Sequence, residues 1–192
     1  MSRRKLNKVV ICHGRGDDPD SHWFPWLADK LGKRGFSVVR PRFPGSEGKN
    51  LENWVETFSQ QVGLLNADTL LVGHGLGVGL ILRLLEKSST AAGGCMLVSG
   101  WDESLDLKGL NFRIEPSYRT PIDYAKVRPK LGFCRLYHGD DDPIVPLELG
   151  QELARKLQSD LTVISNGGQL DAAWEYYSFY ELLDDIEDIF LL

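Results

Sequence analysis

The stretch TLLVGHGLGVGLILRLL, residues 69–85, decides the fold of this chain. It begins as a short apolar run typical of a buried strand and ends as an apolar run of helical length, with glycines at positions 73, 75 and 77 between them. Gly73 and Gly77 suit a sharp turn, because a side chain at either position would clash where the helix packs against the strand. The stretch therefore predicts a buried strand, a tight turn with Gly75 at its apex, and a helix that returns along the sheet.

The same alternation of strand and helix extends along the chain in both directions. Apolar residues at helical spacing mark the segments between strands, for example Leu149, Leu153 and Leu157. Repeated strand–helix units favour a parallel sheet that is covered on both faces. We therefore predict the α/β class, a three-layer α/β/α sandwich around a doubly wound, mostly parallel sheet of about six strands. The expected strands are residues 8–13, 36–40, 69–73, 94–99, 133–138 and 161–164.

Length and composition predict one domain over residues 1–192. The net charge of −5 provides no basic surface for nucleic acid or an anionic membrane, and no apolar stretch reaches the roughly 20 residues that span a bilayer. Cys12, Cys95 and Cys134 each lie in an apolar, strand-like run, which indicates buried thiols rather than a disulfide framework or a metal site. We expect a cytoplasmic protein that needs no metal or other cofactor.

Four of the predicted strands end in residues that are unusual for simple loops. In an open α/β sheet, the ligand site lies beyond the carboxyl ends of the strands, so these four loops should converge. The four loops comprise residues 13–16, 73–77, 138–143 and 166–169.

The glycine-rich turn has the setting of a nucleophile elbow, G-x-S-x-G, with glycine in place of serine. Other motifs extend the pattern over nearly the whole chain: His-Gly at 13–14, SHWFPWL at 21–27, LENW at 51–54, LVSG at 97–100, D-x-x-V-P at 142–146, and Gly-Gly at 167–168. With these motifs the chain resembles the small serine hydrolases of the YdeN and retinoblastoma-binding protein nine type. The resemblance implies an α/β-hydrolase fold without a large lid domain.

The resemblance places the nucleophile of that family at Gly75, its catalytic acid at Asp142 and its general base at Gln169. It also implies an oxyanion hole made by the backbone N–H groups of Arg15 and Leu76, which requires no particular side chain. Glycine has no nucleophilic side chain, and a glutamine amide does not accept a proton near neutral pH. The acyl-enzyme route of the family is therefore closed to this chain.

Other residues near the strand ends are candidates for a site. A relocated base is one interpretation of His13, His74 and His138; ordinary structural hydrogen bonds and packing are the simpler interpretation of each. Trp101 and Trp174 follow the fourth and sixth strands, where they either line an apolar pocket or pack in the core.

The acidic run at residues 140–142 predicts two solvated carboxylates and one buried acid rather than a cation site, because three adjacent carboxylates point in different directions. Asp142 lacks the imidazole that the family pairs with it. We therefore expect this carboxylate either to pair with a donor such as the Gln169 amide or to have a raised pKa.

These observations favour a non-catalytic protein that keeps a hydrolase scaffold and binds a small molecule or a protein partner. One alternative is a residual or rewired carboxylesterase-type hydrolase, in which Asp142 acts with His138 or His13. Another is a serine hydrolase that was inactivated deliberately at positions 75 and 169.

Overall fold

The computed structural model describes residues 6–45, 51–101 and 120–190 and has a single six-stranded sheet among them. The strand order is β2-β1-β3-β4-β5-β6, and every neighbouring pair is parallel. This confirms the predicted fold class, with strand ends shifted by at most one residue. The strands are β1 (Lys8–Cys12), β2 (Ser37–Val39), β3 (Thr69–His74), β4 (Gly94–Val98), β5 (Phe133–Gly139) and β6 (Asp160–Ile164).

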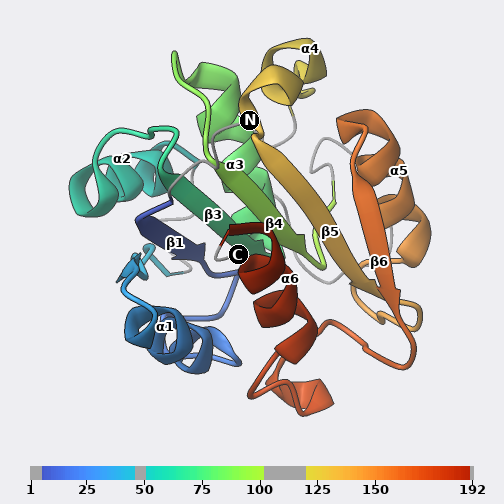
Figure 1. Ribbon diagram of the computed structural model, residues 1–192. Helices are drawn as coiled ribbons and strands as arrows, with labels where there is room; N and C mark the ends of the chain where they lie inside the picture. The colour runs from blue at the N-terminus through green and yellow to red at the C-terminus, as the bar shows by residue number, and fades with distance from the viewer. Residues whose placement is uncertain (1–5, 46–50, 102–119, 191–192) are drawn as a thin grey trace.

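Helices cover both faces of the sheet and form the outer two layers (Figure 1). One face packs against α2, α3 and α5, and the other packs against α1 and α6. The helices are α1 (Phe24–Lys33), α2 (Leu51–Val62), α3 (Leu76–Lys87), α4 (Tyr124–Val127), α5 (Leu147–Leu157) and α6 (Tyr180–Phe190), with short 3₁₀ turns η2 (Arg128–Lys130) and η3 (Ala172–Trp174).

The alternation of side chains along the strands builds these two cores. In β1, Val9 and Ile11 join the core under α1 and α6, whereas Val10 and Cys12 join the core under α2 and α3. Both sets are buried, which explains why the strand reads as a continuous apolar run rather than an alternating one.

The strand order changes direction between β1 and β3, since β2 lies on the far side of β1. The register pairs Cys12 with Gly73, so these two strands end at the same level of the sheet. Such a switch point opens a crevice between the loops that follow the two strands. The loop after β1 and the turn after β3 are therefore the neighbours from which a site is built.

The three cysteines have no disulfide partner. Burial raises the pKa of the Cys134 thiol to about 11, so little reactive thiolate is present near neutral pH. Among the helices of the described residues, none is long and apolar enough to cross a membrane.

Candidate ligand site at the carboxyl ends of the strands

The turn between β3 and α3 has the backbone of a strained elbow. Gly75 stands at the N-terminus of α3 with φ 54° and ψ −119°, and its N–H donates to the Val98 carbonyl at 3.0 Å. A Cβ added at Gly77 would overlap with the Cys12 carbonyl, and one added at Gly73 would lie 2.7 Å from Ile81 Cδ1. The close approach of helix and strand is therefore what requires the outer glycines.

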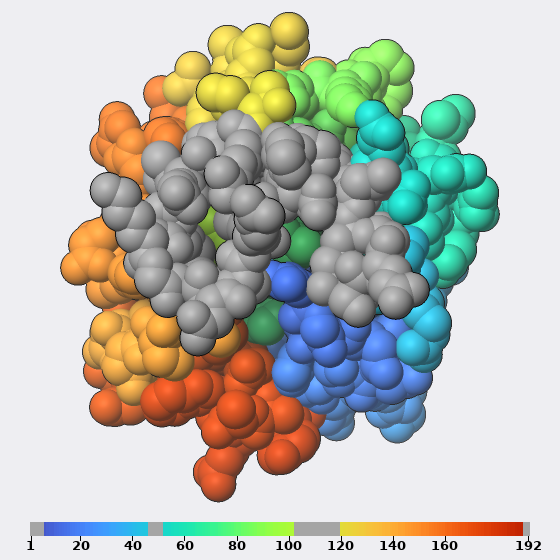
Figure 2. All heavy atoms as spheres, turned by 180° about the vertical axis from the view of Figure 1, so that it is seen from behind, coloured from blue at the N-terminus to red at the C-terminus, as the bar shows by residue number. Residues whose placement is uncertain are grey.

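The apex itself has room for a side chain. A Cβ at Gly75 would lie 3.8 Å from Gly14 Cα and 3.9 Å from Gln169 Nε2, both ordinary contact distances. The β1–α1 loop, residues 13–23, and the loop that carries Gln169 thus border the apex of the turn, the position that the sequence resemblance predicts for the nucleophile. Figure 2 shows blue atoms of the first loop beside green atoms of the β3–α3 region on this face of the molecule.

Gln169 is almost completely buried, with 5% of its surface exposed. Its Nε2 donates to the Ser99 carbonyl at 3.3 Å, and its Oε1 has no hydrogen-bond partner among the described residues. The Gln169 amide therefore donates to Ser99 and not to the Asp142 carboxylate, which was the first of the two outcomes expected from the sequence.

Asp142 is held by the backbone of its own loop. Its Oδ1 accepts from the N–H groups of Ile144 at 2.8 Å and Val145 at 2.9 Å. Its Oδ2 lies 3.4 Å from His138 Nε2 and has no hydrogen-bond partner within the described part of the chain. Burial raises the pKa of Asp142 above its ordinary value despite the two backbone N–H donors, which is the second of the outcomes expected from the sequence.

The two other acids of this loop are exposed and bind the loop after β6. Asp140 accepts from the Ser165 hydroxyl at 2.8 Å and the Asn166 N–H at 2.7 Å, and Asp141 accepts from the Gly168 N–H at 2.8 Å. These carboxylates fix the position of the segment that presents Gln169.

Neither His13 nor His138 has the geometry of a general base. The His13 ring donates from Nδ1 to the Gly14 carbonyl at 2.8 Å and accepts at Nε2 from the Phe43 N–H at 3.1 Å. His138 donates from Nε2 to the Val145 carbonyl at 2.8 Å and is 1% exposed. His13 has both nitrogens occupied, and His138 is buried under the acidic loop, so the structural interpretation of both residues fits their contacts.

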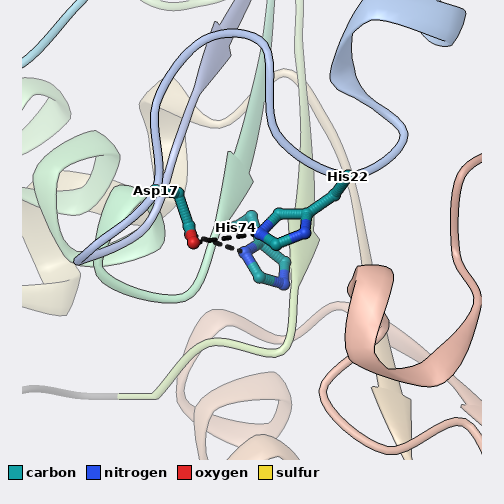
Figure 3. A group of neighbouring side chains, drawn as sticks. All are labelled: Asp17, His22 and His74. Carbon is teal, nitrogen blue, oxygen red and sulfur yellow. Dashed lines mark ion pairs between the residues drawn. The ribbon is translucent and has the colours of Figure 1, made fainter.

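A cluster that the sequence did not reveal lies next to the elbow, because it includes His74, the residue before Gly75 (Figure 3). Asp17 Oδ1 is 2.9 Å from His22 Nε2, and Asp17 Oδ2 is 3.7 Å from His74 Nδ1. The other nitrogen of each ring binds the backbone of the β6–α6 connection: His74 Nε2 donates to the Gln169 carbonyl at 2.9 Å, and His22 Nδ1 accepts from the Ala172 N–H at 3.0 Å. We call Asp17, His22 and His74 the loop clamp, because they join three loops that are distant in sequence.

The loop clamp has the residue types of a metal site, with ligand atoms within 4.8 Å of one another. Its hydrogen bonds do not fit that use. Because His22 Nδ1 accepts a backbone N–H, the neutral ring must carry its proton on Nε2, the nitrogen that a metal would need. The proton instead faces Asp17, so the donor set suits a charged hydrogen-bonding cluster.

The charges in the loop clamp support one another. Burial alone would lower the pKa of His74, but the Asp17 carboxylate and the Gln169 carbonyl outweigh burial and raise it. Burial alone would raise the pKa of Asp17, but His22 and His74 hold it far below its ordinary value. Near pH 6, a carboxylate and an imidazolium therefore lie beneath the Gly75 turn.

The tryptophan of the His-Trp-Phe-Pro-Trp run completes this arrangement. Trp23 is fully buried, and its Nε1 donates to the Leu170 carbonyl at 2.9 Å. Together with His22, it ties the first loop to the residues that directly follow Gln169. The His-Trp-Phe-Pro-Trp run thus contacts the loop that carries Gln169.

The remaining candidates occupy different environments. Trp101 is buried, and its Nε1 has no hydrogen-bond partner among the residues that the structure describes. Trp174 is 37% exposed and covers Gly168, where an added Cβ would collide with the indole ring. Trp174 therefore shields the Gln169 loop from outside.

Comparison with known proteins gives a consistent result. The sequence profile of a family described as serine hydrolase matches residues 9–186. The chain is 32% identical to YdeN of Bacillus subtilis (strain 168) over 163 residues, 84% of each chain, and 23% identical to the serine hydrolase RBBP9 of Rattus norvegicus over 176 residues, 91% of this chain and 90% of that one. The crystal structure of the B. subtilis ydeN gene product superposes with a TM-score of 0.84 at 28% identity, over 97% of this chain and 100% of that one. Mouse alpha/beta hydrolase domain-containing protein 10 shares the fold, with a TM-score of 0.69 at 16% identity over 97% and 90% of the two chains.

Proposed function

The chain belongs to the serine hydrolase family, and from this premise we propose that it is a non-catalytic member that binds a small molecule at the carboxyl ends of its strands. The observation that carries the proposal is the pair of residues at the apex. Gly75 keeps the elbow backbone but offers no nucleophile, and the amide beside it, from Gln169, donates to a backbone carbonyl. Covalent catalysis of the family type needs both a nucleophile and a base at these positions.

The contacts of the histidines support the loss of catalysis. A rewired hydrolase would need an imidazole nitrogen that faces a bound water or substrate. His13 uses both ring nitrogens in hydrogen bonds. His74 donates from Nε2 to the Gln169 carbonyl, and its Nδ1 lies 3.7 Å from the Asp17 carboxylate. His138 donates its Nε2 proton to Val145 beneath the acidic loop. Neither alternative base suits water activation at Gly75.

A small-molecule ligand is favoured over a protein partner because the first loop borders a cavity of about 300 Å³, the lower end of the range for ligand pockets. We also propose a cytoplasmic location, which the three unpaired thiols support.

The direct test is hydrolysis of p-nitrophenyl acetate by the purified protein beside its Asp142→Asn and His138→Ala variants, with buffer as the blank. We expect little turnover above buffer, and the same turnover in all three proteins. An oxyanion hole and substrate binding alone can accelerate hydrolysis by up to about 10³-fold. A residual acceleration of that size is therefore consistent with the proposal if neither variant changes it.

The opposite outcome is equally clear. Turnover that falls at least tenfold in either variant, with circular dichroism spectra that match the parent protein, would show a working catalytic group at this site. The proposal of a non-catalytic binding protein would then be wrong.

A further inference from the structure

The connection between β6 and α6 presents a group of aromatic side chains to solvent. Of the six exposed large apolar side chains among the described residues, three lie within residues 174–180: Trp174, Tyr177 and Tyr180, which are 37%, 65% and 58% exposed. The segment that carries them lies beyond the carboxyl ends of the strands (Figure 1). Single exposed apolar side chains are ordinary on a protein surface, but a group of aromatic ones is characteristic of an interaction surface.

The backbone of this segment holds the aromatic side chains in place. The Trp174 N–H donates to the Asp171 carbonyl at 3.0 Å, and the Asp171 carboxylate accepts from the Ala173 N–H at 2.9 Å. Phe179 is fully buried, and its ring meets that of Trp23 at 5.7 Å. Because the segment is fixed at both ends, its exposed rings lose little conformational freedom when a partner binds.

The charge around the aromatic group is negative. No lysine, arginine or histidine follows Lys156 in the sequence. Glu175, Glu181 and Asp184 are exposed, and their carboxylates form no ion pair with a cation of the described residues. The exposed rings therefore lie in a stretch of surface that carries uncompensated acids.

An acid from the β5–α5 loop adds to this negative charge. Asp141 is exposed and accepts from the Gly168 N–H at 2.8 Å, and the Trp174 ring packs against the same glycine. Burial raises the pKa of the Tyr176 hydroxyl, and Glu181 and Asp141 raise it further. Acids from two separate elements thus lie near the segment that carries the exposed rings.

The cations of this chain leave the outermost rings uncovered. Lys30 Nζ lies 6.0 Å from the ring centroid of Trp26, and that ring meets Tyr180 with centroids 4.9 Å apart. Within residues 6–45, 51–101 and 120–190, no cation lies in this way over Trp174 or Tyr177. Lys30 shows how a cation meets the edge of this aromatic group, and the two outer rings are open to a cation from another molecule.

From these features we propose that the connection between β6 and α6 docks a partner protein through a segment rich in lysine and arginine. The charge of the surface selects this partner: the rings offer cation–π contacts to guanidinium and ammonium groups, and the acids offer ion pairs and attraction at longer range. We call its exposed residues the acidic aromatic surface: Trp174, Glu175, Tyr177, Tyr180, Glu181 and Asp184. This inference goes beyond the proposed small-molecule binding and does not rest on it.

The first test measures the binding of two fluorescein-labelled peptides to the full chain by fluorescence anisotropy at low ionic strength. One peptide has the sequence GRRGRRG, and in the other each arginine is replaced by citrulline, which has nearly the same shape and no charge. We expect the arginine peptide to bind at least about tenfold more tightly, and added salt to weaken its binding. Equal affinity for the two peptides would overturn the inference without any substitution in the protein.

Matched variants then locate the binding surface. Glu181→Gln and Tyr177→Ser should each weaken binding of the arginine peptide at least about threefold, because one removes an ion pair and the other a cation–π contact. The controls are Glu52→Gln, exposed on α2, and Leu64→Ser, 94% exposed between α2 and β3; each should change binding less than about twofold.

Each control removes the same kind of group elsewhere on the surface, so the comparison separates docking from attraction by net charge alone. Equal losses in Glu181→Gln and Glu52→Gln, or unchanged binding in Tyr177→Ser, would overturn the inference. Amide shifts in ¹⁵N spectra of the wild-type protein should concentrate in residues 171–181 when the arginine peptide is added. Shifts confined to Gly14 and Gly75 would place the peptide at the carboxyl ends of β1 and β3 and would also overturn it.

Discussion

At the residue scale, Asp142 is a buried carboxylate, and the resemblance to the family predicts it to be the catalytic acid of a triad whose imidazole position is Gln169. Its Oδ1 is satisfied by two backbone N–H groups. Among the described residues, its Oδ2 has no hydrogen-bond donor and lies 3.4 Å from His138 Nε2, whose proton already goes to the Val145 carbonyl. The pKa of Asp142 is therefore raised above 3.8, mainly by burial. A carboxyl with a raised folded-state pKa costs no stability below about pH 3.8 and costs progressively more as the pH rises through its folded-state pKa.

We therefore expect Asp142→Asn to raise the free energy of unfolding at pH 7 by about 1 kcal/mol, because asparagine keeps the Oδ1 acceptor and removes the buried charge. Urea denaturation at pH 7 and pH 4 measures the effect, which should shrink at the lower pH. Asp184→Asn, at an exposed position, is the control and should change stability by less than about 0.5 kcal/mol. A clear loss of stability in Asp142→Asn at pH 7 would indicate that the carboxylate has a charged partner.

The elbow offers a second test at the residue scale. Gly77→Ala should lower the free energy of unfolding by about 3 kcal/mol, because its Cβ would overlap with the Cys12 carbonyl and helix α3 would have to move away from the sheet. Gly32→Ala, in α1 with nothing within 4 Å of the added Cβ, should stabilise the protein by up to about 1 kcal/mol. Thermal unfolding of both variants measures the two effects. Similar shifts of the melting temperature in Gly77→Ala and Gly32→Ala would refute a steric role for Gly77.

At the element scale, the loop clamp joins the loops after β1, β3 and β6. Asp17 and His22 lie in the loop after β1, His74 is the last residue of β3, and the backbone partners of the two histidines lie after β6. Since loops have few buried apolar contacts of their own, such polar clusters determine how precisely they are positioned. The clamp is therefore what holds the Gln169 loop against the Gly75 turn.

Asp17→Asn should lower the free energy of unfolding by about 2–4 kcal/mol, because it leaves the His74 imidazolium without its buried counter-charge. The raised pKa of His74 contributes stability that is complete below about pH 6.5 and declines as the pH rises through the folded-state value. The lowered pKa of Asp17 contributes stability that is complete above about pH 3.8 and declines as the pH falls through its folded-state value. The free energy of unfolding should therefore differ most between wild type and Asp17→Asn between about pH 4 and pH 6.5.

Denaturant unfolding from pH 3 to pH 9 measures that profile. Asp29→Asn is a matched control, because Asp29 pairs with the exposed side chain of Lys33 at 2.7 Å, and exposed pairs contribute about 0–1 kcal/mol. A difference for Asp17→Asn that does not vary with pH would contradict a charged clamp.

At the scale of the whole molecule, the sequence predicted the sheet because buried parallel strands are apolar along their whole length, as in Val9 to Cys12. Its motifs also predicted which strand ends meet: Gly75 and Gln169 are adjacent in the structure although 94 positions separate them in the chain. The partners of individual polar side chains were not predictable. Gln169 binds Ser99, and Asp17 binds His74, through contacts that depend on the final packing of loops and have no local periodicity.

In the proposed function, the loss of catalysis is confined to two positions, and this leads to a prediction for the double variant Gly75→Ser with Gln169→His. The elbow backbone and the space at the apex are present, and Asp142 Oδ2 has no hydrogen-bond partner in the part of the chain that the structure describes. The double variant should therefore hydrolyse p-nitrophenyl acetate at least about 10²-fold faster than the parent protein, the usual contribution of a positioned base, while each single variant stays near the parent level because nucleophile and base depend on each other. If a folded double variant remains at the parent rate, then the loops have moved beyond the geometry of the family, and binding alone has determined their present positions.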